Sequence, residues 1–184
     1  TIGNKSIYEN QLLIITLSAS DADGDSLIYN VFDLPPGAIF VDNVFTWTPT
    51  FAQSGIYNVT FEVSDGLIED TEVVTITANN VNQSPILSAI GAHSINEGEL
   101  LTITLSASDA DGDSLSYNVD NIPSGAVFID STFSWMPTSS QSGSYDVTFK
   151  VSDGSIEDTE VVTLTVNNVN QTPVLSPIGA HSIN

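Results

Sequence analysis

The 184-residue sequence contains no cysteine, so no disulfide staples the fold and no thiol chemistry is available. Basic residues are almost absent, because two Lys+Arg stand against 23 Asp+Glu, for a formal net charge of -21. Such a charge repels nucleic acid and anionic membrane surfaces, and it attracts divalent cations. No apolar run approaches the roughly 18 residues that span a bilayer. We therefore expect no nucleic-acid partner and no membrane insertion in this segment.

Hydrophobic residues make up 41% of the chain, which indicates a folded core and not a disordered acidic tail. Solubility at high salt is one explanation for the acids. However, the acids cluster at a few places, which favours a local role. The sequence has no signal peptide and starts in the middle of a pattern at Thr1, so we expect it to come from a longer polypeptide.

An internal repeat organises the chain. Trp47 and Trp135 lie 88 positions apart, and the same offset maps the motif at Asp21–Asp25 onto Asp109–Asp113. About two thirds of the aligned positions are identical, which indicates tandem duplication of one module. We expect repeat 1 at residues 1–82, repeat 2 at 83–170, and the start of a third repeat at 171–184, where PVLSPIGAHSIN matches PILSAIGAHSIN.

Apolar and polar residues alternate with period 2 along each repeat, and no helical periodicity is present. In repeat 2 the expected strands centre on Ile86–Ile95, Leu101–Leu105, Leu115–Val119, Ala126–Phe128, Phe133–Trp135, Tyr145–Val151 and Val162–Val166. This pattern predicts an all-β protein of two tandem seven-stranded Greek-key β-sandwiches, plus the first strand of a third repeat. The single Trp of each repeat is expected in the core.

The topology of such a sandwich predicts where the acids lie. The loop after the second strand, with Asp109, Asp111 and Asp113, and the loop after the sixth strand, with Asp153, belong to the end where the chain enters repeat 2. Glu9 follows the first strand of repeat 1 and belongs to the opposite end of that repeat. We therefore expect acids that are far apart in sequence to converge on the inter-repeat junction.

Carboxylate and carbonyl oxygens, without Cys, favour calcium with about 6–8 oxygen ligands over zinc. Two carboxylates in Asp-x-Asp repel each other unless a cation neutralises them. Asn80 and Asn82 of the linker add amide and carbonyl oxygens. An EF-hand does not fit, because counting from Asp109 puts Gly112 at position 4 and not at position 6. The alternative is that these acids are solvated turn residues.

Several motifs resemble known modules. LSASDADGDSLSYNV, and VSDG followed by VVTLTVNNVNQTP, resemble cadherin sequences. FSWMPT and GSYDVTFKVSDG are closer to the dystroglycan-type cadherin-like and putative Ig (immunoglobulin-like) tandem repeats of prokaryotic cell-surface proteins. The resemblance covers both repeats. It implies a cadherin-like or Ig-like fold and an extracellular, cell-surface location.

The resemblance also implies ligands. Asp109, Asp111 and Asp153 match the calcium ligands at the entry end of a cadherin domain, and Asp21, Asp23 and Asp65 match them in repeat 1. The full set of candidate calcium ligands is Glu9, Asp21, Asp23, Asp25, Asp65, Asn80, Asn82, Asp109, Asp111, Asp113 and Asp153. The linker carries fewer acids than a cadherin linker, so we expect fewer ions and weaker affinity.

Two functions remain open. The first is an extracellular structural or adhesive module, stiffened by calcium at the junction, that forms a stalk, adhesin array or filament with neighbouring copies of the repeat. The second is a calcium-dependent module that binds polysaccharide or protein, for which Phe32 and Phe51 are the exposed aromatic candidates.

No nucleophile elbow, phosphate loop or recurring Ser/His/Asp set is present, so we expect no enzyme. The sequons at Asn4, Asn58, Asn82 and Asn170 are candidate glycosylation sites.

Assembly follows from the repeat boundaries. Thr1 aligns with Ala89, so repeat 1 lacks the stretch that matches Gln83–Ser88, whereas Gln171–Ser176 provides a surplus copy of it. Strand donation between copies would build a head-to-tail filament. Trimming from a continuous polypeptide is the alternative.

Overall fold

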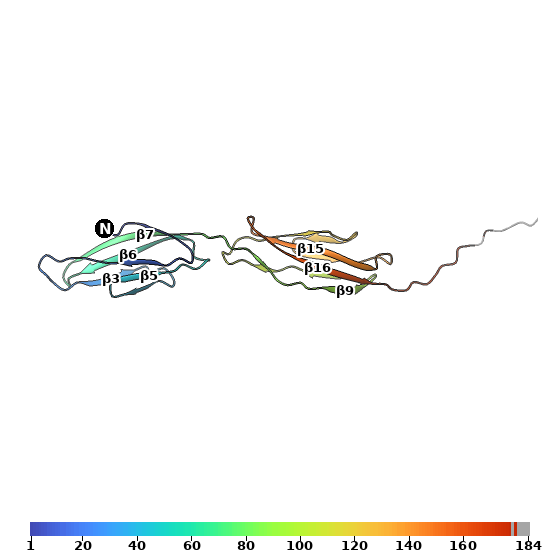
Figure 1. The fold of residues 1–184 in the computed structure, drawn as a ribbon, viewed down its shortest axis with the longest axis horizontal. Helices are drawn as coiled ribbons and strands as arrows, with labels where there is room; N and C mark the ends of the chain where they lie inside the picture. Colours follow the sequence, from blue (N-terminus) through green and yellow to red (C-terminus); the bar gives the residue numbers. More distant parts are fainter. Residues whose placement is uncertain (178, 180–184) are drawn as a thin grey trace, which may run out of the picture. The chain divides into compact units, whose positions relative to one another are not determined.

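The computed structural model describes residues 1–177 and 179 of the chain. All regular structure among these residues is β, as the sequence predicts. The chain divides into two compact units, Thr1–Ser84 with Asp109–Ser114, and Pro85–Ser108 with Leu115 onward. In each unit a four-stranded sheet and a three-stranded sheet form a sandwich (Figure 1), and the second unit has a further two-stranded sheet. The expected third repeat at 171–184 falls partly on residues 178 and 180–184, which lie outside the described residues.

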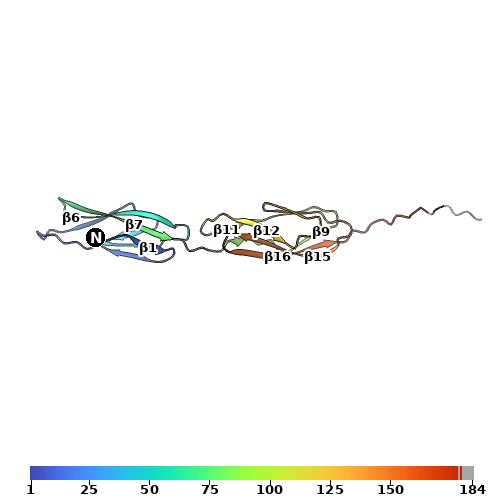
Figure 2. The ribbon, with the colours of Figure 1, turned by 90° about the horizontal axis from the view of Figure 1, so that it is seen from above.

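Repeat 1 forms the seven strands expected for an Ig-like sandwich. They are β1 (Lys5–Tyr8), β2 (Leu13–Thr16), β3 (Ile28–Phe32), β4 (Ile39–Val41), β5 (Val44–Trp47), β6 (Gly55–Ser64) and β7 (Glu69–Asn79). One sheet has the order β1-β7-β6-β3 and the other β2-β5-β4. The first strand β1 pairs in parallel with the last strand β7, with Lys5 opposite Ile76 (Figure 2). This pairing ties the N-terminal strand to the strand that leads into the linker.

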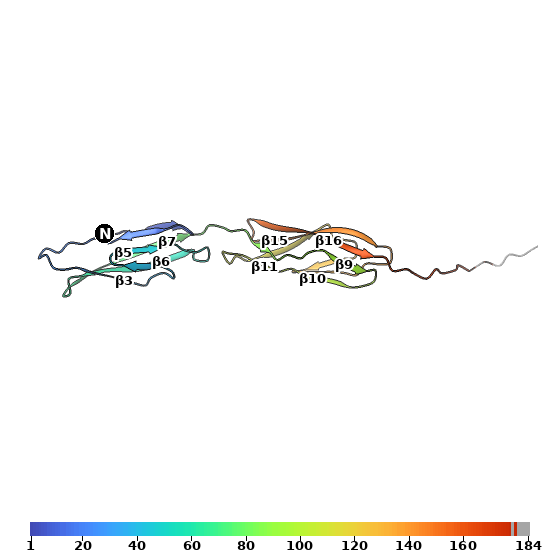
Figure 3. The same cartoon turned by 60° about the horizontal axis from the view of Figure 1, so that its bottom comes forward.

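Repeat 2 copies this arrangement with two short additional strands. Its strands are β8 (Ile86–Leu87), β9 (His93–Asn96), β10 (Leu101–Thr104), β11 (Ala107–Ser108), β12 (Ser116–Asp120), β13 (Val127–Ile129), β14 (Thr132–Trp135), β15 (Gly143–Ser152) and β16 (Glu157–Asn167). The sheets are β12-β15-β16-β9 and β10-β14-β13, and β8 pairs with β11. Figure 3 shows β9 beside β16.

The first strand of repeat 2 differs from the sequence expectation. The alternation predicts a single strand over Ile86–Ile95, but the structure splits it into β8, which pairs with β11, and β9, which pairs with β16. Gly91 lies between them at φ +71°, a left-handed conformation that Gly adopts without steric cost. This turn moves the chain from one pairing partner to another. Period-2 alternation carries no information about such a switch.

Each core is built around its tryptophan, as predicted. Trp47 and Trp135 are each 1% exposed. The indole of Trp47 packs edge-on against Tyr57 with ring centroids 4.8 Å apart, and Trp135 packs the same way against Tyr145 at 4.9 Å. Edge-to-face contact suits the charge distribution of aromatic rings. Alternating residues of β6, β7, β15 and β16 contribute to the two cores, together with residues of other strands such as Phe45 in repeat 1 and Phe133 in repeat 2.

Candidate metal centre

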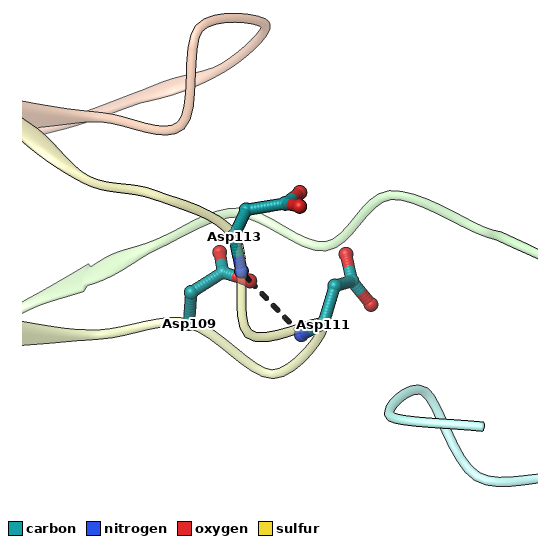
Figure 4. Close-up of side chains that lie close together, drawn as sticks. All are labelled: Asp109, Asp111 and Asp113. Atoms are coloured by element: carbon teal, nitrogen blue, oxygen red, sulfur yellow. Dashed lines mark hydrogen bonds between the residues drawn. The ribbon is translucent and has the colours of Figure 1, made fainter. Parts of the chain in front are cut away.

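The loop Asp109–Ser114 folds around one carboxylate. Asp109 Oδ1 accepts the backbone N–H of Asp111 at 2.9 Å and that of Asp113 at 3.2 Å. This wrapping brings oxygens of Asp109, Asp111 and Asp113 within 4.8 Å of one another (Figure 4). Asp residues favour such turns because their side chains bond to the backbone two residues on. The sequence therefore positions three negative groups where they repel one another.

Two oxygens of this loop are buried without a hydrogen-bond partner. They are Asp109 Oδ2 and Asp111 Oδ1. The other oxygen of Asp111, Oδ2, accepts the N–H of Gln83 at 2.6 Å, so the loop holds the linker backbone. Leaving a charged oxygen buried and unpaired costs free energy, which a bound cation would remove.

The matching loop of repeat 1 has the same backbone turn but not the same grouping. Asp21 Oδ1 accepts the N–H of Asp23 at 2.8 Å and that of Asp25 at 3.1 Å. Asp23 is exposed, whereas its counterpart Asp111 is half-buried. Among the described residues, the three acids whose oxygens come within 4.8 Å are those of the Asp109 loop. The metal role of Asp21, Asp23 and Asp25 stays a prediction.

Glu9 is the most deeply buried acid of repeat 1. Its residue is 2% exposed, Oε2 accepts the N–H of Val81 at 2.9 Å, and Oε1 has no hydrogen-bond partner. The next residue, Asn10, has φ +59°, a left-handed conformation that Asn tolerates. It lies in the turn that follows β1, where the N–H of Gln11 donates to Tyr8 O. Glu9 thus bonds to the linker backbone, with one oxygen left for another ligand.

Glu97 repeats the Glu9 arrangement, and the sequence reasoning did not name it as a site residue. It is 8% exposed, Oε2 accepts the N–H of Val169 at 2.9 Å, and Oε1 is unpartnered. Glu9 and Glu97 are the buried charged residues among those described. The signal was available, because Glu97 lies one repeat length after Glu9.

In both Asp65 and Asp153, the carboxylate oxygen Oδ1 accepts two backbone hydrogen bonds within a turn. Asp65 Oδ1 accepts the N–H groups of Ile68 and Leu67, both at 2.7 Å, and these bonds hold the pKa of Asp65 below its ordinary value. Asp153 Oδ1 accepts the N–H of Ser155 at 2.6 Å and of Ile156 at 2.7 Å. Hydrogen bonds to the ionised form favour that form. Their roles as metal ligands stay predictions.

The remaining candidates lie on the surface. Asn80 and Asn82 are exposed in the linker, and Asn82 Nδ2 donates to Gln83 O at 3.2 Å. Asn58 Oδ1 accepts the hydroxyl of Thr75 at 2.9 Å. Asn4 Oδ1 accepts the N–H of Thr75 at 3.1 Å. The amides of two of the four sequons therefore bond within the sheet, and glycosylation at Asn4, Asn58, Asn82 and Asn170 stays a prediction.

The exposed aromatics differ in part from expectation. Phe32 is 49% exposed, as predicted, whereas Phe51 is only half-buried. Tyr8, which the sequence reasoning missed, is 54% exposed. It ends β1 at an outward position where repeat 2 has the polar Asn96, so this difference between the repeats was the available signal.

Both repeats match one family model. The putative Ig domain matches residues 1–79 and again residues 84–167. The chain belongs to the putative Ig domain family. This confirms the resemblance stated from the motifs and the all-β, Ig-like fold. Tandem Ig-like and cadherin-like repeats are typical of extracellular adhesive or structural modules, and the fold is generally non-enzymatic.

Similarity to individual proteins is more distant. Chitinase A of Pseudoalteromonas piscicida is 31% identical over 121 residues, which cover 63% of this chain and 15% of the chitinase. Human protocadherin-24 EC1-2 has 17% identity and a TM-score of 0.47, over 92% of this chain and 95% of that one. An endo-fucoidan hydrolase of glycoside hydrolase family 107 has 20% identity and a TM-score of 0.43, over 92% and 28%. The described part of the chain contains no membrane-spanning helix.

Proposed function

We propose that this chain is an extracellular structural or adhesive module that binds calcium through the Asp109 loop and Glu9 and uses the ion to stiffen its linker. The observation that carries the proposal is a set of buried carboxylate oxygens without hydrogen-bond partners: Glu9 Oε1, Asp109 Oδ2 and Asp111 Oδ1. Glu9 accepts a hydrogen bond from the linker residue Val81. Asp109 and Asp111 belong to the loop in which Asp111 accepts a hydrogen bond from Gln83 of the linker. A cation gives these oxygens a partner that the protein itself does not provide.

The ligand chemistry favours calcium over other divalent ions. The candidate donors are carboxylate and carbonyl oxygens on irregular backbone, which suits the flexible coordination of calcium. Magnesium requires near-ideal octahedral geometry, and zinc selects nitrogen and sulfur.

Stiffening follows from which backbone groups the acids hold. Glu9 bonds to the N–H of Val81, and Asp111 bonds to the N–H of Gln83. Without an ion, the repulsion among the acids opposes these bonds. With an ion bound, the carboxylates are neutralised and both linker bonds persist. The linker then behaves as a fixed segment between repeats, which is what a stalk or adhesin array requires.

Isothermal titration calorimetry of the decalcified chain with calcium, alongside thermal melting with and without chelator, tests the proposal. Binding to the folded state alone raises the melting temperature by mass action. Asp111→Asn should weaken calcium binding by at least about 10–100-fold, the range for perturbed metal sites. Asp23→Asn is the matched control, because it makes the same change in the same motif of repeat 1 and should leave this affinity unchanged.

The stiffening claim needs its own readout. Distances between spin labels at exposed positions of the two repeats should narrow in distribution when calcium is added. An unchanged melting temperature together with no calorimetric binding would refute the metal site. Binding without narrowing would refute the stiffening and leave the site standing.

Polysaccharide binding is the second candidate. The favouring observations are the chitinase relative and the exposed rings of Tyr8 and Phe32. Aromatic faces exposed on a module are typical of sugar contact. Co-sedimentation of the chain with insoluble chitin, compared with Phe32→Ala, decides this candidate. Pull-down that Phe32→Ala abolishes would support it, and the absence of pull-down would exclude chitin as the partner.

A further inference from the structure

The outward face of the sheet β1-β7-β6-β3 in repeat 1 exposes large apolar side chains to solvent. Each strand of the sheet contributes one, and they are Tyr8 of β1, Val73 of β7, Ile56 of β6 and Phe32 of β3, which are 54%, 61%, 73% and 49% exposed. The next residues along β1 and β7, Ile7 and Val74, point the other way and are buried in the core. The four exposed side chains therefore share one face of the sheet without serving the core.

Repeat 2 has the same sheet order but a polar face at the same place. Four outward positions are apolar in repeat 1 and polar in repeat 2, since Tyr8, Ile28, Phe32 and Ile56 correspond to Asn96, Ser116, Asp120 and Ser144. The strand β7 does not differ, since its outward residues Val73, Thr75, Thr77 and Asn79 correspond to Val161, Thr163, Thr165 and Asn167 of β16. The fold thus forms without these apolar residues, and a contiguous apolar patch that the fold does not need marks an interaction site.

The register of the strands arranges the four side chains as a diagonal stripe. Phe32 and Val73 share one row across β3, β6 and β7. Tyr8 lies in the row of Asn79, six residues farther along β7, and Ile56 occupies a row between them. The stripe therefore runs about 20 Å along the strands and, over three inter-strand steps, about 14 Å across them. It is long and narrow.

Uncharged polar groups flank the diagonal stripe. The hydroxyls of Thr60, Thr75 and Thr77 belong to the same outward face. Asn58 Oδ1 accepts the hydroxyl of Thr75 at 2.9 Å, which leaves the Asn58 Nδ2 group as a donor for a ligand. No ionised side chain of the four strands lies on this face between the first and last rows of the stripe. Hydroxyls and amides both donate and accept hydrogen bonds, so they suit a ligand rich in hydroxyl groups.

Charge and area decide between the ligands of such a face. The formal net charge of -21 repels an anionic polymer and a second copy of this chain, and Glu62 and Glu69 border the face on its outward side. The area between the first and last rows is about 300 Å² from the strand spacings, against about 800 Å² per partner in a stable protein interface. A single extended polymer chain contacts a narrow stripe along its length and does not need the larger area.

We infer that this face of repeat 1 binds one extended chain of an uncharged polysaccharide along the diagonal stripe. The inference rests on polysaccharide binding, the second candidate function above, and adds to it the face, the course of the chain and the charge of the ligand. The C–H groups of the sugar rings pack against the rings of Phe32 and Tyr8, whose faces carry partial negative charge, and Ile56 covers the middle of the chain. The sugar hydroxyls bond to the flanking Thr and Asn side chains. None of the candidate calcium ligands lies on this face, so this binding does not require calcium.

Exchange of outward residues between the repeats tests the inference, because each residue already occupies the same position in a folded repeat. The repeat 1 exchange combines Tyr8→Asn, Phe32→Asp and Ile56→Ser, and removes the stripe. The repeat 2 exchange combines Asn96→Tyr, Asp120→Phe and Ser144→Ile, and builds a second stripe. Ile39→Ser is the matched control, because Ile39 is 58% exposed on β4 of the other sheet. Far-UV circular dichroism checks that every variant is folded.

Native gel electrophoresis with a dissolved polymer in the gel measures binding as retardation relative to a gel without polymer. The uncharged probes are hydroxyethylcellulose, glycol chitin, arabinoxylan and galactomannan, and the anionic probes are alginate and dextran sulfate. At least one uncharged probe should retard the unmodified chain, equally in calcium and in chelator, and no anionic probe should. The repeat 1 exchange should weaken binding at least about tenfold, given the free energy of burying large apolar side chains. The repeat 2 exchange should strengthen retardation, and Ile39→Ser should leave it unchanged.

The outcomes separate this inference from polysaccharide binding in general. Retardation by the anionic probes alone, or retardation that the repeat 1 exchange leaves unchanged, would overturn the inference while polysaccharide binding stands. Binding that chelator abolishes would assign the polymer to the calcium region and overturn the inference as well. No retardation by any probe would refute both. Sedimentation velocity covers the remaining occupant: a dimer of the unmodified chain that the repeat 1 exchange dissociates would assign the face to a second copy and overturn the inference.

Discussion

Truncation of Trp135 to Ala is expected to unfold repeat 2 far below the melting temperature of repeat 1. The side chain is 1% exposed and packs edge-on against Tyr145. Its Nε1–H donates to Ser124 O at 3.2 Å, but Gln141 Nε2 donates to the same carbonyl at 2.9 Å. The carbonyl therefore keeps a partner in Trp135→Ala, and the loss comes from packing and cavity formation.

The magnitude follows from that burial. A large buried aromatic cut back to Ala typically costs about 3–5 kcal/mol. Small domains have a total free energy of unfolding of about 5–15 kcal/mol. For a domain of this size, the cost corresponds to a fall in melting temperature of roughly 12–40 °C. Repeat 2 would then lose between about a fifth and all of its stability, while repeat 1 would keep its own Trp47.

The two tryptophans allow the repeats to be followed separately. In Trp135→Ala the remaining fluorophore is Trp47, so fluorescence reports repeat 1, and far-UV circular dichroism reports both repeats. We expect an early circular dichroism transition without a fluorescence change, followed by a second transition seen by both probes. Trp47→Ala should give the mirror-image result. A single transition within about 1 kcal/mol of the unmodified protein would refute the assignment of Trp135 to the core.

Further predictions concern local interactions. The N–H groups of Gly3 and Ile2 hold the pKa of Glu72 below its ordinary value of 4.5. The hydrogen bonds to the ionised Glu72 therefore stabilise repeat 1 fully above that pH, and this stabilisation is lost as the pH falls through the pKa of Glu72 in the folded protein. Glu72→Gln should therefore flatten the acid side of the stability–pH profile of repeat 1 in chemical denaturation. Asp120 raises the pKa of Lys150 through a hydrogen bond, so Lys150→Met should remove a small stabilising contribution that high salt also removes, measured by melting at two salt concentrations. Asp42 sits at φ +56° between β4 and β5, so Asp42→Val should cost about 1–2 kcal/mol whereas Asp42→Gly should be nearly neutral, by denaturant titration.

Much of the fold follows from local sequence patterns. Apolar and polar residues alternate along Tyr145–Val151 and along Val162–Val166, and this pattern predicts two strands. In the first of them the inward residues should be Tyr145, Val147, Phe149 and Val151. These four side chains are buried or half-buried in the structure. A strand exposes successive side chains to opposite faces, so the sequence specifies the buried face directly. The sequence also predicts that Asp109 and Asp153 lie in turns, because Asp-rich turns are local structures.

Other features depended on residues far apart in the chain. Nothing in the local sequence distinguishes Glu9, which is 2% exposed, from an ordinary solvated turn acid. Glu9 is buried where its N–H donates to Asn79 O at the end of β7 and its side chain accepts the N–H of Val81, 72 positions away. The same holds for Asp111, which bonds to Gln83, 28 positions earlier, and becomes half-buried where its counterpart Asp23 stays exposed.

The sequence by itself therefore determined the repeat, the all-β fold, the tryptophan-centred cores and the acidic turns, because each depends on periodicity or on turn chemistry within a few residues. Only the tertiary structure decided which carboxylate oxygens are buried without partners and where the first strand of repeat 2 changes its pairing partner. These features depend on contacts between segments that are far apart in the sequence. A carboxylate oxygen is shielded from solvent only when other strands and loops pack around it, which no single strand can do.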